Sequence, residues 1–108
     1  MIYLATPYSN PDKAVRLARF EYACRIAGRL MAAGHVVFSP IAHTHPIAVR
    51  SDLPLDWEYW QRFDREFLKV SEKMVVVMMD GWRESKGISA EVLIAEELQI
   101  PIEFIEAE

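Results

Sequence analysis

The stretch KMVVVMMDGWRESKGISAEVLIAEELQ, residues 73–99, decides the fold of this chain. It begins with an apolar run, Met74–Met79, which is short, rich in β-branched residues and closed by Asp80. Such a run predicts a strand buried on both faces of a sheet, because parallel strands covered by helices have continuous apolar sequences. We therefore expect this strand to lie at the centre of a parallel sheet.

A helix is predicted directly after this strand. A polar turn with Ser85 and Gly87 separates the two elements, and apolar residues then recur at helical spacing from Ile88 to Leu98. Glu91 falls in the first turn of this predicted helix, where the positive field of the N-terminus favours an ionised carboxylate. Ligands collect at the carboxyl ends of parallel strands, so this strand, loop and helix are typical of the part of an α/β unit that bears the site.

The composition is that of one ordinary globular domain over residues 1–108, with 52% hydrophobic and 26% charged residues. The formal net charge of −4 gives no electrostatic basis for binding a nucleic acid polymer or an anionic membrane. No apolar run approaches the length of a membrane span. The single cysteine, Cys24, excludes an intrachain disulfide and fits a reducing compartment, so we expect a cytoplasmic protein.

The remaining patterns predict alternating strands and helices. In chain order they are a strand at 2–5, a helix at 11–33 capped by Asn10, a strand at 35–39, a helix at 57–70 and an edge strand at 101–105. Together with the central stretch, they predict a single-domain α/β three-layer sandwich of the flavodoxin or Rossmann-like kind. Its parallel sheet should have four or five strands in the order 2-1-3-4, with helices on both faces.

Residues 41–55 form the longest segment without periodicity, and prolines at 46 and 54 favour a functional loop or lid. His43 and His45 alternate, which places both on the same side of an extended segment. With His35 or Asp52 they could form a zinc site, but two histidines without a clear third ligand more often line a pocket. We expect them to line a substrate crevice, with no metal and no cofactor.

The acids Asp64, Asp80 and Glu91 come from three elements that this topology can bring together. Two carboxylates about 5 Å apart suit a retaining glycosyl transfer, one as nucleophile and one as acid and base. The alternative is that Asp80 only turns the chain and Glu91 is a solvated helix residue. Trp82 can either stack on a nucleobase or pack against the neighbouring loop. Trp57 and Trp60 are interpreted as core or subunit-interface residues.

Several short motifs occur in series along almost the whole chain. They are IYLA at 2–5, Asp64 followed by Phe67-Leu68, the apolar strand with Asp80, and SKGISAE at 85–91 followed by Ala95. In this order they resemble the nucleoside 2-deoxyribosyltransferase superfamily, which includes N-deoxyribosyltransferases and 2′-deoxynucleoside 5′-monophosphate N-glycosidases. The segments ATPYS at 5–9, SPIAHTHPI at 39–47 and DGWRESKG at 80–87 are similar to a bacterial and phage subgroup of that superfamily.

The resemblance implies roles for three residues in catalysis. Glu91 matches the nucleophile that attacks C1′ of a deoxyribosyl group and forms a covalent glycosyl-enzyme. Tyr3 matches the phenol that orients this carboxylate, and Asp64 matches the acid that contacts the base or passes a proton to the departing nitrogen.

The resemblance also implies substrate contacts. Asp80 lies near the acid that contacts the sugar or base, and Ser85 and Gly87 match the loop that holds the 5′ end of the sugar or its phosphate. The Ser-x-Arg phosphate grip of the monophosphate glycosidases is replaced here by a segment with Tyr8, which we place in the crevice. Arg50 or Arg83 could substitute for the missing arginine.

These residues predict an enzyme that cleaves or transfers the N-glycosidic bond of a nucleoside or nucleotide through Glu91. A nucleotide-binding sensor module of the same fold is the alternative. The resemblance and the apolar, tryptophan-containing helix at 57–70 lead us to expect a homodimer or homotetramer.

Overall fold

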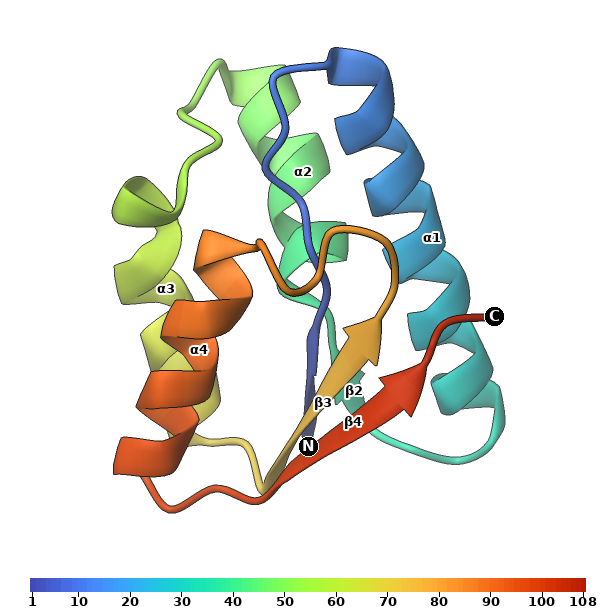
Figure 1. Cartoon of the computed structure of the whole chain (residues 1–108), viewed down its shortest axis with the longest axis vertical. Coiled ribbons are helices and arrows are strands. Elements are labelled where there is room, and N and C mark those ends of the chain that lie inside the picture. The colour runs from blue at the N-terminus through green and yellow to red at the C-terminus, as the bar shows by residue number, and fades with distance from the viewer.

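The computed structural model describes all 108 residues and alternates strands and helices along the chain (Figure 1). The elements are β1 (Ile2–Ala5), α1 (Lys13–Ala32), β2 (Val37–Phe38), α2 (Pro40–Ser51), α3 (Trp57–Lys69), β3 (Lys73–Met78), α4 (Lys86–Glu97) and β4 (Ile102–Glu106). None of the helices combines the length and apolar character needed to cross a membrane.

The four strands form one parallel sheet in the order β2-β1-β3-β4, which confirms the predicted fold class and strand order. Tyr3 of β1 lies opposite Met74 of β3, and Val76 of β3 lies opposite Phe104 of β4. β3 is thus an interior strand, and its buried run Met74–Val77 explains why its sequence is apolar without alternation.

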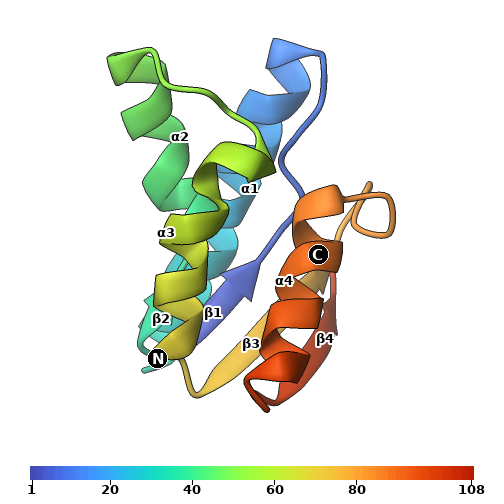
Figure 2. The same ribbon diagram turned by 90° about the vertical axis from the view of Figure 1, so that its left-hand side faces the viewer.

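Helices cover the two faces of the sheet as two separate layers. On one face, Tyr3 and Val76 pack against Leu68 of α3 and against α4; on the other, Leu4 and Val77 pack against α1. Figure 1 shows α3 and α4 on one side of the sheet and α1 on the other, and Figure 2 views the molecule from the side of α3 and α4. Successive residues of β1 point to opposite faces, so this one strand contributes to both cores.

The segment predicted as a loop or lid at 41–55 is instead mostly the helix α2, so that prediction was wrong. The Ser39 side chain caps α2 by accepting a hydrogen bond from the Ala42 amide at 3.1 Å, and Pro40 occupies the first turn, where no N–H is needed. Pro46 lies within the helix. Asp52 then ends α2 in a left-handed conformation, with a φ of 54°.

Two predicted boundaries also differ from the structure. α1 is capped by Asp12, whose side chain accepts a hydrogen bond from the Ala14 amide at 2.9 Å, rather than by Asn10. The second strand is limited to Val37–Phe38 because it pairs with β1 at only two positions. Gly34 follows α1 with a φ of 98°, a left-handed conformation that glycine adopts without strain.

Candidate active site

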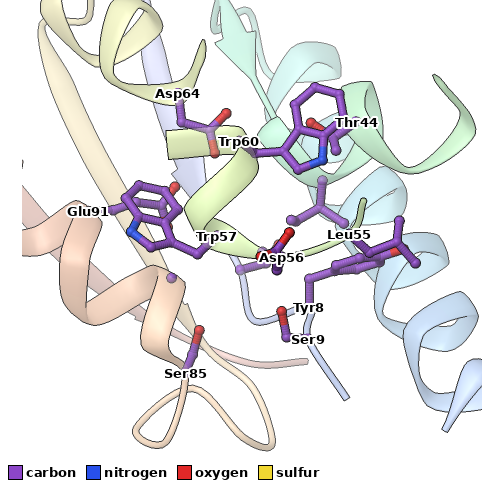
Figure 3. Close-up of a pocket in the computed structure, with 13 residues that line it drawn as sticks. Tyr8, Ser9, Thr44, Leu55, Asp56, Trp57, Trp60, Asp64, Ser85 and Glu91 are labelled. Carbon is purple, nitrogen blue, oxygen red and sulfur yellow. The ribbon is translucent and has the colours of Figure 1, made fainter. Parts of the chain in front are cut away.

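A cavity lies at the carboxyl ends of β1 and β3, where parallel sheets usually bind ligands (Figure 3). Its wall comes from the segment after β1, from α2, from the connection 52–56 with α3, and from the start of α4. The lining residues are Thr6, Tyr8, Ser9, Ile41, Thr44, Leu55, Asp56, Trp57, Trp60, Asp64, Ser85, Gly87 and Glu91. The cavity measures about 50 Å³, which is room for a few water molecules.

Tyr3 and Glu91 meet behind this cavity, although 88 positions separate them in the chain. The Tyr3 hydroxyl donates a hydrogen bond to Glu91 Oε2. Tyr3 is fully buried and Glu91 is 5% exposed. This confirms the predicted contact between the two side chains, and Glu91 lines the cavity.

The position of Glu91 follows from the local structure of α4. The Ser85 side chain caps this helix by accepting a hydrogen bond from the Ile88 amide at 3.1 Å, and the helix begins at Lys86. Glu91 therefore lies in the second turn and not in the first, which corrects the sequence prediction. The field of the helix N-terminus acts mainly over the first turn, so it does little to ionise this carboxyl group.

Burial dominates the protonation of the two acids in the cavity. It raises the pKa of Glu91 to about 8; the Tyr3 hydrogen bond lowers this pKa and the charge of Asp64 raises it. Burial also raises the pKa of Asp64 to about 7. The pKa of Tyr3 is raised well above its ordinary value, first by burial and then by the two carboxylates, so the phenol stays a donor. The expectation of an ionised Glu91 was therefore wrong for the free protein.

The charge of Asp64 raises the pKa of Glu91, so the titrations of the two acids are linked. Near neutral pH the pair keeps at least one proton, since both pKa values lie at or above 7. Tyr3 favours the negative charge on Glu91, whereas the more complete burial of Glu91 favours its protonation. Both carboxyl groups titrate near neutral pH, so each can act as acid or base.

Three of the predicted substrate contacts, Tyr8, Ser85 and Gly87, line the same cavity as Glu91. Asp80 does not, because it is exposed and lines a separate hollow with Arg19. The predicted meeting of three acids is therefore limited to Asp64 and Glu91.

Trp82 lies outside the cavity as well. Its ring packs near Phe104 of β4, with the ring centroids 5.7 Å apart, so Trp82 packs against a strand of the sheet and not against the neighbouring loop. The Arg83 guanidinium lies over the same indole, 5.2 Å from its centroid, and is also absent from the cavity wall.

The histidines of α2 point in different directions, because side chains two positions apart on a helix lie on opposite sides. His45 Nδ1 shares a hydrogen bond of 2.5 Å with the Tyr8 hydroxyl, and its ring stacks on Phe20. His43 packs against the stacked rings of Phe38 and Phe67. Neither lines the cavity, although His45 reaches it through Tyr8. No three histidine, cysteine or acidic side chains are placed to hold a metal ion.

The sequence interpretation missed the tryptophans of α3 as site residues. Trp57 and Trp60 line the cavity together with Asp64, four residues after Trp60 (Figure 3). The spacing of these three residues places them on one helix face, and this signal could have identified them. The Trp60 indole N–H donates to the Pro54 carbonyl at 2.7 Å and so ties α3 to the connection that precedes it.

Comparison with curated proteins found no match to the chain. The family model described as "Domain of unknown function (DUF1937)" matches residues 1–107, which is almost the full length. The chain therefore belongs to the DUF1937 family.

Proposed function

We propose that the protein cleaves or transfers the N-glycosidic bond of a nucleoside or nucleotide, with Glu91 as the nucleophile. One observation carries this proposal: the Tyr3 phenol donates to the Glu91 carboxylate, and Glu91 lines a cavity together with Asp64. A retaining glycosyl transfer needs one carboxylate to attack and a second carboxyl group to move a proton.

The reaction would proceed in two displacements. Glu91 attacks C1′ of the sugar while the bond from C1′ to the base nitrogen breaks, and Asp64 supplies a proton to the departing nitrogen where the base needs one. The resulting glycosyl ester is then attacked at C1′ by water or by a second base, which gives its proton to Asp64, and Glu91 leaves as a carboxylate. Water as acceptor makes the enzyme a hydrolase, and a base makes it a transferase.

These steps require Glu91 to be ionised and Asp64 to hold a proton. Positive charge develops at the sugar in the transition state, which stabilises the ionised form of Glu91 and leaves the proton on Asp64. The Tyr3 hydrogen bond acts in the same direction, because it favours negative charge on Glu91. Substrate binding thus favours the form with an ionised Glu91 and a protonated Asp64, which the free protein only partly populates.

The cavity wall supports a flat aromatic ligand without a strong charge. Trp57, Trp60 and Tyr8 offer aromatic surface for a base, and no lysine, arginine or histidine belongs to the wall. Arg16 lies in an adjoining hollow that shares Ser9, Leu55 and Asp56 with the cavity. A nucleoside therefore fits the wall better than a 5′-monophosphate, and Arg16 is the candidate partner if a phosphate binds.

Release of free base tests the proposal. The protein is incubated with deoxynucleosides, ribonucleosides and their monophosphates, and bases are separated by chromatography. Glu91→Gln should abolish release, whereas Glu96→Gln, which changes an exposed acid of the same helix, should not. Intact-protein mass spectrometry should show a glycosyl adduct on wild type and none on Glu91→Gln. No release by wild type, or full activity in Glu91→Gln, contradicts the proposal.

A ligand-binding sensor is the second candidate, favoured by the raised pKa of Glu91. A protonated carboxyl group binds through hydrogen bonds and does not attack C1′. A sensor would show saturable nucleoside binding by calorimetry with no base release over long incubation. In the enzyme, by contrast, binding and base release should occur with the same nucleosides.

A further inference from the structure

The Thr6 hydroxyl is the one buried side-chain polar atom in this protein that has no hydrogen-bond partner. Thr6 follows β1 directly, at the carboxyl end of the strand, and is 4% exposed. It belongs to the wall of the cavity that Asp64 and Glu91 share. An unpaired buried hydroxyl is unfavourable, because it has lost its hydrogen bonds to water and gained none from the protein.

The hydroxyl groups of two serines with similar burial are paired. Ser39 is 6% exposed and its hydroxyl accepts from the Ala42 amide at 3.1 Å. Ser71 is 7% exposed and its hydroxyl donates to the Phe67 carbonyl at 2.8 Å. These serines stabilise helix ends, whereas Thr6 stabilises no neighbouring element through its hydroxyl. The contrast indicates that the partner of Thr6 comes from outside the chain.

We propose that the Thr6 hydroxyl binds the 3′-hydroxyl of the sugar and so selects substrates that carry it. This inference rests on the proposed function. Glu91 must contact C1′ of the sugar, and Thr6 lines the same small cavity as Glu91. We therefore place the sugar, rather than the base, next to Thr6. A threonine hydroxyl both donates and accepts a hydrogen bond, as a sugar hydroxyl does.

Such a contact makes a specific demand on the substrate. A site built to hydrogen-bond a hydroxyl rejects an analogue that lacks it, because a buried polar group is then left unpaired. Removing the hydroxyl from the protein and removing it from the substrate should therefore each break the same hydrogen bond, so their effects on catalysis should not add. The two changes together should weaken catalysis little more than the change in the substrate alone.

The experiment combines two variants with two substrates. Thr6→Val keeps the shape of the side chain without its hydroxyl, and Thr6→Ser keeps the hydroxyl. Each protein is assayed for base release from a 2′-deoxynucleoside and from the 2′,3′-dideoxynucleoside with the same base. Thr6→Val should lower kcat/KM for the 2′-deoxynucleoside about tenfold, the value of one hydrogen bond, and leave that for the dideoxynucleoside unchanged. Thr6→Ser should stay close to wild type. The Tm of Thr6→Val should not fall, because no internal hydrogen bond is lost.

Equal losses on both substrates, or no loss on either, overturn the inference. A clear fall in the Tm of Thr6→Val also overturns it, since the hydroxyl would then have a partner within the protein. If wild type releases no base from any substrate, the proposed function fails. The inference is then tested by the rise in Tm that each nucleoside produces on binding. A rise with the 2′-deoxynucleoside that Thr6→Val abolishes supports the inference. A rise that is equal in both proteins, or absent from both, overturns it.

Discussion

The stability of this protein should fall as the pH rises from about 5 to about 8, and Glu91→Gln should remove much of this dependence. The pKa of Glu91 is about 8 in the folded protein, against an ordinary value of 4.5. The folded protein therefore holds a proton that the unfolded chain has released through most of this pH range. Stability from this group is complete below pH 4.5 and is lost as the pH approaches 8.

The magnitude follows from proton linkage. Each proton held only by the folded state lowers the free energy of unfolding by about 1.4 kcal/mol for each unit rise in pH. Over the range from about pH 5 to pH 8, the contribution of Glu91 amounts to roughly 4 kcal/mol as an upper bound. Asp64, with a pKa of about 7, adds a second proton over part of the same range. A glutamine at position 91 stays neutral and can still accept the Tyr3 hydrogen bond.

Urea denaturation at a series of pH values measures this effect, with tryptophan fluorescence as the signal. The difference in free energy of unfolding between Glu91→Gln and wild type should grow with pH in favour of the variant. Glu96→Gln is the matched control, and its curve should run parallel to that of wild type, because Glu96 is exposed. Parallel curves for Glu91→Gln and wild type would refute the reasoning, since Glu91 would then titrate as it does in the unfolded chain.

Two further variants probe the surroundings of the site. Tyr3→Phe removes the hydrogen bond that lowers the pKa of Glu91. The pH–rate profile of base release should therefore shift to higher pH, and activity near pH 7 should fall about tenfold. An unshifted profile would show that the phenol does not lower the pKa of this carboxyl group. Gly81→Ala should destabilise the protein by roughly 1–2 kcal/mol in urea denaturation, because Gly81 has a φ of 90° and its added Cβ would meet the Arg19 guanidinium. Gly28→Ala is the control within α1, where a Cβ meets nothing within 4 Å, and it should stabilise by about 0.5–1 kcal/mol.

The predicted strand order and the contact between Tyr3 and Glu91 were accessible from the sequence. The apolar run of β3 identified an interior strand, because only a strand covered on both faces is apolar at every position. The contact was expected from the family resemblance, and the parallel topology explains it, since β1 and β3 are neighbours and α4 packs on the face that Tyr3 occupies.

The wall of the cavity was less accessible. Prolines at 46 and 54 suggested a loop where α2 forms, because proline disfavours a helix interior, yet Pro46 lies inside α2 and Pro54 follows its end. Trp57 and Trp60 share a helix face with Asp64, but whether that face meets a core or a cavity depends on how closely the neighbouring elements approach. The same limit applies to Asp80, whose side chain is exposed rather than directed towards Glu91.

The small volume of the cavity has a consequence for kinetics. A nucleoside is larger than about 50 Å³, so the cavity can enclose it only when the surrounding segments move apart. The hydrogen bond between Trp60 and the Pro54 carbonyl holds one of these segments in place. The observed rate constant of association should therefore level off at high ligand concentration, at the rate constant of opening. The apparent dissociation constant should equal the intrinsic dissociation constant divided by the fraction of protein that is open.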